Sequence, residues 1–183
     1  MLNKFLSLFL LLMLSPLFLI ISILVIISDN LPVFYSQNRI GLDSRVFTIY
    51  KFRTMKVGTP ELATHLLQNP NSYLLTTGKI LRKFSLDELP NLFNVLKGDM
   101  VFVGPRPALH NQHDLIELRK KEGIDKIKPG ITGWAQVNGR DELTIEEKIK
   151  YDKEYIERKS FFFDLKILFL TFFKVFLRSG VNH

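Results

Sequence analysis

The stretch RKFSLDELPNLFNVLKGDMVFVGPRP, from Arg82 to Pro107, decides how the rest of the chain is interpreted. Its centre is a pair of adjacent acids, Asp87 and Glu88, and basic residues stand before and after the pair at Arg82 and Arg106. Carboxylates placed between fixed cations suit an anionic substrate and a divalent metal, because hard cations prefer oxygen ligands. The stretch therefore predicts a site for a phosphate-linked group.

The same spacing also has a purely structural interpretation. Ser85 is a good N-cap residue, and Glu88 stands three positions later, where a capping box has its acid. Acids in the first turn of a helix are stabilised by the helix dipole, so Asp87 and Glu88 can serve a helix alone. Spacing by itself leaves the two interpretations open.

The composition combines apolar character with positive charge. The 183 residues are 46% hydrophobic and include 16 Phe, and 25 Lys and Arg outnumber 18 Asp and Glu. This combination is typical of a protein on an anionic membrane surface. Nucleic-acid binding is the other use of a net charge of +7, but the cations are scattered among Phe and Leu rather than gathered in a basic tract. Cysteine is absent, which excludes disulfides and thiolate metal ligands.

An apolar segment opens the chain. Residues 5–28 carry no charge, and a helix of about 20 apolar residues is long enough to enter a bilayer. A signal peptide would end in a small-residue cleavage site, which the segment lacks. Ser15-Pro16 interrupts it, because Pro16 has no N–H and crowds the preceding turn, onto which Ser15 can hydrogen-bond. A kinked spanning helix and a broken, re-entrant helix both remain open, and the basic residues that follow favour a cytosolic position for residues 31–183.

A β-hairpin is predicted from Pro32 to Met55, with turn residues at 41–44. Lys51 and Arg53 stand at alternate positions of its return strand, and therefore on one face. They form either a solvated strand face, which spacing alone favours, or a pair of cations directed at a phosphate. A short helix is predicted next, at Thr59–Leu67.

The C-terminal half is predicted to be mostly helical. One polar helix is expected at Ala108–Glu122 and another at Ile145–Arg158. The second follows another acid pair, Asp141-Glu142, and contains Asp152. By spacing, these acids belong to a solvated helix that is rich in Glu and Lys.

Residues 161–178 predict an amphipathic helix. At helical spacing its polar residues share one arc, while Leu165, Phe169 and Phe172 lie on the opposite side. Its charges make a spanning helix costly, so an interfacial helix in the headgroup plane is favoured over a buried core helix.

The predicted fold class is therefore α+β: a mainly helical, membrane-associated domain with a small β-hairpin region and interfacial amphipathic helices. Residues 1–30 form its membrane helix, broken at Ser15-Pro16, and residues 31–183 form a catalytic domain that ends in the interfacial helix 161–178.

Taken together, the motifs resemble the bacterial sugar transferases. The matching pieces occur in the family's order over nearly the whole chain: Ser15-Pro16, KFRTM at Lys51–Met55, SLDELP at Ser85–Pro90, NVLKGDM at Asn94–Met100, VGPRP at Val103–Pro107 and PGITGWAQVNGR at Pro129–Arg140. The resemblance is to the small monotopic phosphoglycosyl transferases that begin lipid-linked glycan assembly, without the upstream helices and further domain of the large relatives. Phe84, Asn91 and Val101 depart from the usual pattern, but none of them removes a charge or a nucleophile.

The resemblance implies a two-step reaction on the cytosolic face of the bacterial inner membrane. Asp87 attacks the sugar-bearing phosphorus of a UDP-sugar and releases UMP, and polyprenyl (undecaprenyl) phosphate then takes the phospho-sugar from Asp87. Mg²⁺ is implied at Asp87 and Glu88, with Glu88 supporting the metal or activating the incoming phosphate. Five further active-site positions are implied, their cations on phosphate: Lys51, Arg82, Arg106, Arg140 and Asp152.

The resemblance also implies that Ser15-Pro16 makes a re-entrant helix with both ends cytosolic, in contact with membrane lipids. Three other hypotheses are kept. The chain is a catalytically inactive, membrane-anchored scaffold, or a nucleic-acid-binding module, which both apolar segments oppose. The third is a sugar-phosphate transferase in which the acid pair acts as base and metal ligand without a covalent step.

Overall fold

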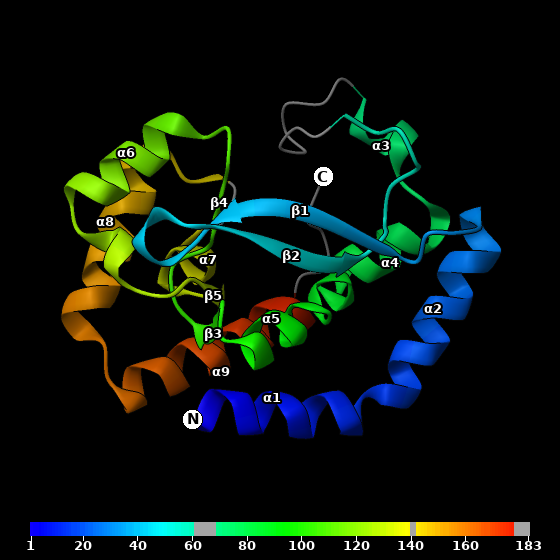
Figure 1. The fold of residues 1–183 in the computed structure, drawn as a ribbon, viewed down its shortest axis with the longest axis horizontal. Coiled ribbons are helices and arrows are strands. Elements are labelled where there is room, and N and C mark those ends of the chain that lie inside the picture. Colours follow the sequence, from blue (N-terminus) through cyan, green and yellow to red (C-terminus); the bar gives the residue numbers. More distant parts are fainter. Residues whose placement is uncertain (61–68, 140–141, 178–183) are drawn as a thin grey trace.

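The computed structural model describes residues 1–60, 69–139 and 142–177, in which helices surround two small sheets (Figure 1). The helices are α1 (Leu2–Met13), α2 (Ser15–Asp29), α3 (Pro70–Tyr73), α4 (Thr76–Lys83), α5 (Asn91–Lys97), α6 (His113–Lys121), α7 (Trp134–Asn138), α8 (Ile145–Arg158) and α9 (Phe161–Leu177). The strands are β1 (Phe34–Ile40), β2 (Val46–Phe52), β3 (Val101–Val103), β4 (Ala108–Leu109) and β5 (Gly130–Thr132). The predicted mixed class, mainly helical, is confirmed, while most of the helix predicted at Thr59–Leu67 lies outside the described residues.

The predicted β-hairpin is confirmed. Strands β1 and β2 pair antiparallel with Phe34 opposite Phe52 and Ile40 opposite Val46. A one-turn 3₁₀ helix, η1 (Leu42–Ser44), joins them at the turn residues that the sequence indicates. The hairpin runs through the middle of the molecule, and helices lie on both sides of it (Figure 1).

The predicted helix at Ala108–Glu122 is wrong at its N-terminal end. Ala108 and Leu109 form strand β4, which pairs antiparallel with β1 and extends the sheet to the order β2-β1-β4. Helix α6 begins only at His113. The tertiary reason is that β1 offers a free edge to the segment that leaves Pro107, so strand pairing outweighs the local helical pattern.

A second sheet joins β3 and β5 in parallel, with Val101 opposite Gly130 and Val103 opposite Thr132. The backbones approach closely here: a Cβ on Gly130 would lie 2.1 Å from the amide nitrogen of Gly104. Only glycine fits at this contact, and it fixes the path of the chain as it leaves β3 towards Arg106.

The first two helices meet at a sharp break. Helices α1 and α2 are bent by 62° at Leu14, next to the predicted Ser15-Pro16 break. Ser15 donates its hydroxyl to the carbonyl of Leu12 at 2.8 Å, and Pro16 stands in the first turn of α2. Among the described helices, none is by itself long and apolar enough to cross a bilayer, whereas α1 and α2 together pass that test of length and composition as a bent pair.

Helix α2 packs into the body beside the acid pair. Its Ile21 and Val25 form a buried cluster with Phe52 of β2 and Leu81 of α4. Leu86 and Leu89, on either side of the acid pair, pack against the same cluster. Helix α1 is attached to α5, where the buried Ser7 donates a hydrogen bond to the carbonyl of Leu92 at 2.6 Å.

Helix α8 has the predicted bounds, Ile145–Arg158, and starts with a capping box between Thr144 and Glu147. Its Tyr155 hydroxyl joins it to two elements, since it lies 2.9 Å from Oδ1 of Asp164 in α9 and 2.9 Å from the carbonyl oxygen of Val103 in β3. The central cluster of this half contains Tyr155 and Ile167 together with residues of β3 and α7.

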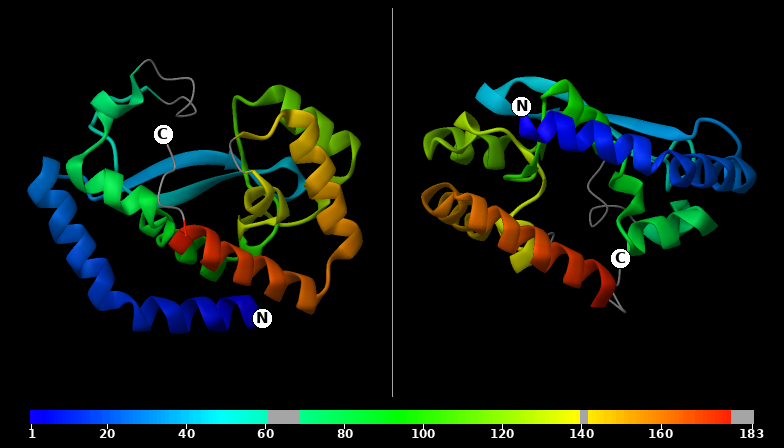
Figure 2. Two further views of the ribbon diagram at one scale, coloured as in Figure 1. Left: turned by 180° about the vertical axis from the view of Figure 1, so that it is seen from behind. Right: turned by 90° about the horizontal axis from the view of Figure 1, so that it is seen from below.

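Helix α9 turns its predicted apolar face outward. Leu165 is 53%, Phe169 62% and Phe172 58% exposed, whereas Ile167 is fully buried. Helices α1 and α2 also expose apolar side chains, among them Phe9 and Ile27. In the view from below, α1 runs across the upper half of the molecule and α9 across the lower half (Figure 2). Exposed apolar area of this extent indicates an interaction surface, so the buried-core alternative is wrong for this face.

Candidate active site

The acid pair occupies a one-turn 3₁₀ helix, η3 (Leu86–Glu88), between α4 and α5. Asp87 and Glu88 are each only 8% exposed. The predicted capping box with Ser85 is wrong, because Ser85 has a left-handed backbone (φ 53°) and its side chain makes no capping hydrogen bond. An N-cap residue needs extended backbone to present its oxygen to the first turn, and Ser85 lacks it. The helix-cap interpretation of the acids therefore loses its main support.

Glu88 is held by two cations from distant parts of the chain. Its Oε1 lies 2.8 Å from Nζ of Lys51 and 3.0 Å from the Arg106 guanidinium. The side chain of Glu88 is 9% exposed and that of Lys51 16%, so water screens this contact weakly. The resemblance implied both cations as active-site positions, and the structure brings both to Glu88.

Lys51 reaches Glu88 from strand β2, with which η3 is in contact. Burial lowers the pKa of the Lys51 ammonium below its ordinary value, although Glu88 opposes the shift; Arg106 lowers the pKa further. The cation is therefore poised to lose its proton more readily than an exposed lysine.

Arg82 lies in the last turn of α4, which precedes the acid pair. Its Nε donates a hydrogen bond to Oγ1 of Thr54 at 3.0 Å, so the residue that follows the KFR segment orients this guanidinium. The contact between α4 and Thr54 is tight, because Gly78 of α4 lies against the Thr54 carbonyl. Arg82 is thus fixed against Thr54, three positions after Lys51 in the KFRTM segment.

Arg106 stands in the loop between β3 and β4, and its backbone is held as well as its side chain. Arg119 of α6 donates through NH1 to the Arg106 carbonyl at 2.6 Å. Arg119 is itself bound by Asp152 of α8, at 2.6 Å and 3.0 Å. Asp152, which the sequence placed in the active site, therefore reaches Arg106 through Arg119.

The Arg119–Asp152 pair is buried, with side chains 11% and 2% exposed. Burial raises the pKa of Asp152, and Arg119 opposes that shift. Position 119 was missed by sequence reasoning, since a basic residue on a polar helix looks solvated and only the docking of α6 on α8 brings it to an acid. Arg140, the remaining predicted position, lies outside the described residues.

A small, open pocket lies beside Glu88. Besides Lys51, Glu88 and Arg106, its polar lining includes Arg39 and Asn91. Arg39 is oriented by Gln37, to whose side-chain oxygen it donates at 2.7 Å. No pattern in the sequence links Arg39 to the acid pair, because the pairing of β1 with β2 and β4 brings it to the pocket. The pocket suits an anionic group.

Asp87 and Glu88 fit a magnesium ion that completes its ligand shell with substrate and water. Within the described ranges, no group of three or more His, Asp or Glu side chains converges as a metal cage. Asp87 and Glu88 supply two adjacent carboxylates. Mg²⁺ commonly binds one or two carboxylates and completes its octahedral shell with water and substrate phosphate oxygens. The acid pair therefore fits a metal that arrives with a phosphate substrate.

An acid pair in which Glu88 is bound by two cations, beside a pocket with a basic lining, is suited to phosphate-group chemistry. The chain belongs to the bacterial sugar transferase family, whose model matches residues 1–178.

Individual relatives agree with this assignment. The chain is 48% identical, over 82% of its length, to the uncharacterized sugar transferase EpsL of Bacillus subtilis, and the match covers 73% of that protein. It is 43% identical, over 93% of its length, to the UDP-glucose:undecaprenyl-phosphate glucose-1-phosphate transferase of Escherichia coli. It is 36% identical, over 93% of its length, to the exopolysaccharide production protein ExoY of Rhizobium meliloti, of which 81% is covered. The match spans only 38% of the Escherichia coli protein.

Proposed function

We propose that this protein transfers a sugar-1-phosphate from a UDP-sugar to polyprenyl phosphate, giving a polyprenyl diphosphate-linked sugar and UMP. The observation that carries the proposal is the buried acid pair, with Glu88 held by Lys51 and Arg106. The printed name of the Escherichia coli relative states UDP-glucose and undecaprenyl phosphate as its substrates, so UDP-glucose is the first sugar donor to test.

Asp87 is the proposed nucleophile. A carboxylate oxygen of Asp87 attacks the sugar-bearing phosphorus, a new P–O bond forms, and the bond to the UMP phosphate oxygen breaks. UMP leaves with the electron pair, and the sugar phosphate remains on Asp87 as an acyl phosphate. An oxygen of polyprenyl phosphate then attacks the same phosphorus and restores the carboxylate. The covalent intermediate divides one exchange between two bulky anions into two easier steps.

The cations have separate roles in this scheme. Lys51 and Arg106 keep Glu88 in place and lie where they can offset charge on the transferring phosphate. Arg82, oriented by Thr54, is a further phosphate contact. Mg²⁺, held by Asp87 and Glu88, would neutralise phosphate charge when bound. Asp152 supports Arg106 through Arg119.

The apolar surfaces fit a lipid substrate. We propose that the bent α1–α2 pair re-enters the same leaflet at Ser15-Pro16 and that α9 lies in the headgroup plane. This places residues 31–183 on the cytosolic face of the bacterial inner membrane. Helix α2 packs against the residues that flank the acid pair, so the site lies near the membrane segment. Polyprenyl phosphate, whose headgroup is confined to the interface, then meets Asp87 there.

The test is UMP release from a panel of UDP-sugars, with Mg²⁺ and polyprenyl phosphate, by the purified protein in lipid vesicles. Wild type is expected to release UMP with at least one sugar, and Asp87→Asn is expected to lose the activity. Glu122→Gln, which breaks an exposed ion pair with Lys153 elsewhere, is the matched control.

Trapping distinguishes the remaining hypotheses. Without the lipid acceptor, wild type is expected to retain the labelled sugar phosphate on Asp87. Turnover without a trapped species would favour the non-covalent scheme, in which the acids act as base and metal ligand. A folded wild type that releases no UMP with any sugar would favour the inactive scaffold.

A further inference from the structure

Four consecutive side chains of the KFRTM segment contact three different parts of the molecule. Lys51 binds Glu88, and Thr54 accepts a hydrogen bond from Arg82. Phe52 packs on Phe18 of α2, with ring centroids 5.2 Å apart. The fourth, Arg53, binds the end of α2, and nothing in the site described above requires this contact.

The Arg53 guanidinium donates hydrogen bonds from all three of its nitrogens. Its Nε donates to the carbonyl of Pro32 at 2.6 Å, and its NH1 to Oδ2 of Asp29 at 2.7 Å. Its NH2 donates to the carbonyls of Asp29 and Asn30, at 2.8 Å and 2.7 Å. Carbonyls at the end of a helix lack partners within the helix, so one guanidinium both caps α2 and holds the link to β1.

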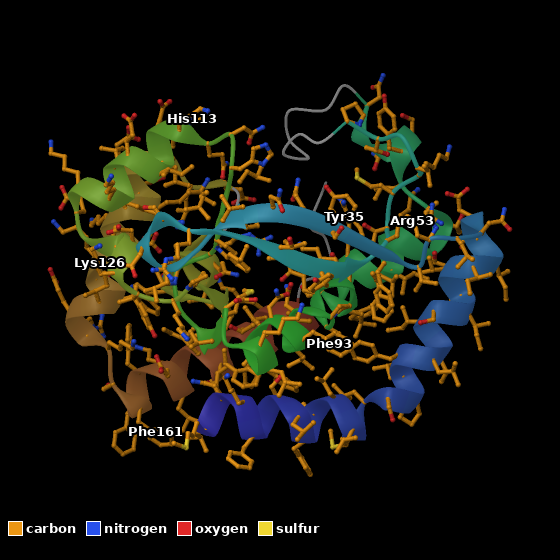
Figure 3. The ribbon with its side chains drawn as sticks, in the orientation of Figure 1. Tyr35, Arg53, Phe93, His113, Lys126 and Phe161 are labelled. Carbon is orange, nitrogen blue, oxygen red and sulfur yellow. The ribbon has the colours of Figure 1, made fainter. Side chains whose placement is uncertain are left out.

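This arrangement replaces both roles considered for Arg53 from the sequence. The residue is 4% exposed, so it is not part of a solvated strand face. Its guanidinium is committed to α2 and the link, so it is not a second cation directed at a phosphate. Figure 3 shows Arg53 where the end of β2 meets the end of α2.

The contact between Arg53 and the end of α2 is suited to fix the distance from α2 to Lys51, in addition to adding stability. Arg53 directly follows β2 and stands two positions after Lys51, so any movement of α2 relative to Arg53 is a movement relative to Lys51 and Glu88. Phe52, between them, packs on the same helix in a buried cluster with Ile21 and Val25. The strand that carries Lys51 is thus attached to α2 at two points.

We propose that Arg53 and Asp29 form a positioning clamp that sets the height of the acid pair relative to the lipid surface and so governs access of the lipid acceptor. The inference rests on the proposed function, since it assumes that α1 and α2 lie in the membrane. Arg53 is a positioning residue, because it touches α2 and not the reacting groups.

The two substrates should depend on the clamp to different degrees. A UDP-sugar arrives from water and needs only Lys51, Glu88 and their neighbours, whose contacts lie within the body of the protein. Polyprenyl phosphate is confined to the headgroup plane, so its phosphate reaches Asp87 only when the site is at the right height. Because a displacement of about 1 Å can cost up to a hundredfold in rate, a loosened clamp should penalise the lipid step.

The experiment compares Asp29→Asn and Arg53→Lys with wild type, as full-length protein in vesicles of defined composition containing polyprenyl phosphate. Each variant is expected to raise the KM for polyprenyl phosphate about tenfold and to leave the KM for UDP-glucose within about twofold. The double variant is expected to be no worse than the more affected single one, because Arg53→Lys already disrupts the contact that Asp29→Asn removes. Asp43→Asn, which breaks an exposed pair with Lys126, is the control and should change neither value.

Equal rises in both KM values, or a loss of kcat alone, would overturn the clamp in favour of a general structural role. Hydrogen exchange of residues 46–54 in vesicles supplies a readout that needs no turnover. Asp29→Asn should speed exchange there, whereas Asp43→Asn should not. If wild type fails to turn over, the proposed function is contradicted; unchanged exchange in Asp29→Asn would separately overturn the clamp.

Discussion

Nζ of Lys51 lies 2.8 Å from Oε1 of Glu88, and this contact joins the central hairpin to the one-turn helix that carries the acid pair. Burial lowers the pKa of Lys51, so the ammonium is charged below that lowered value and loses its proton as the pH rises through it. The charge on which Glu88 and a bound phosphate depend therefore disappears at a lower pH than for an exposed lysine.

The alkaline limb of the pH–activity profile is expected to report this residue. In wild type, kcat/KM for UMP release should fall as Lys51 deprotonates. Lys51→Arg should move that fall to higher pH, because arginine keeps its charge up to a pH of about 12. Lys51→Met should lose most activity at every pH. The measurement is kcat/KM from about pH 6 to pH 11, with the exposed Lys126→Arg as control. An alkaline limb that stays in place in Lys51→Arg would show that another group causes it.

The sequence was sufficient to predict those elements whose caps, turns or breaks are formed by residues of the same segment. Helix α8 has the predicted bounds because Thr144 and Glu147 cap it from within. The hairpin likewise forms at the predicted residues. The break at Ser15-Pro16 depends only on the missing N–H of Pro16 and the turn before it, and α1 and α2 meet there.

Prediction from the sequence failed where the local structure or a side chain's contacts depend on residues that are distant in the sequence. Ser85 looks like an N-cap by type, but the chain enters η3 with a left-handed residue, and no sequence pattern showed this. Ala108 looks helical until β1 pairs with it. Arg53 looks like a solvated strand residue or a phosphate cation until the end of α2 is placed beside it. The acid pair was identified by its motif, whereas the contacts that support Arg106 beside it, through Arg119 and Asp152, were not.

Substitutions in the Arg119–Asp152 pair test whether this pair supports Arg106. Asp152→Ala would leave the Arg119 guanidinium buried without its acid, which typically costs about 3–5 kcal/mol of stability. It should also lower the rate of UMP release, since Arg119 holds the Arg106 carbonyl. Thermal unfolding and UMP release measure the two effects.

Replacing both partners, as in Arg119→Met with Asp152→Leu, should recover much of the stability because no buried charge remains. It should not recover the activity, because the hydrogen bond to Arg106 is still lost. A double variant with normal activity would show that Arg106 needs no such support.

The contact between α4 and Thr54 gives a second test. A Cβ on Gly78 would lie 2.2 Å from the Thr54 carbonyl oxygen, so Gly78→Ala must push α4 away from the KFRTM segment. Overpacking of this kind typically costs about 1–3 kcal/mol. The shift should also weaken the hydrogen bond from Arg82 to Thr54 and slow UMP release. Thr76→Ala, at an exposed position of the same helix, is the matched control. Equal stability and activity in Gly78→Ala and Thr76→Ala would contradict the close contact.

The exposed apolar face of α9 tests the membrane proposal without any enzymatic assay. Phe169 is 62% exposed and Phe162 is 79% exposed, so neither contributes much to the folded core. If this face enters the headgroup region, burial of one Phe side chain is worth about 1.5–3 kcal/mol, and Phe169→Glu should weaken binding to anionic vesicles at least tenfold. Val57→Glu, at an exposed apolar position outside α1, α2 and α9, should bind as wild type does. Flotation of the purified protein with vesicles measures both.

Because α1 and α2 also bind lipid in this scheme, the comparison is best made at several lipid concentrations, so that a tenfold change in partition remains visible. Equal flotation of Phe169→Glu, Phe162→Glu and wild type across that range would exclude α9 from the membrane surface.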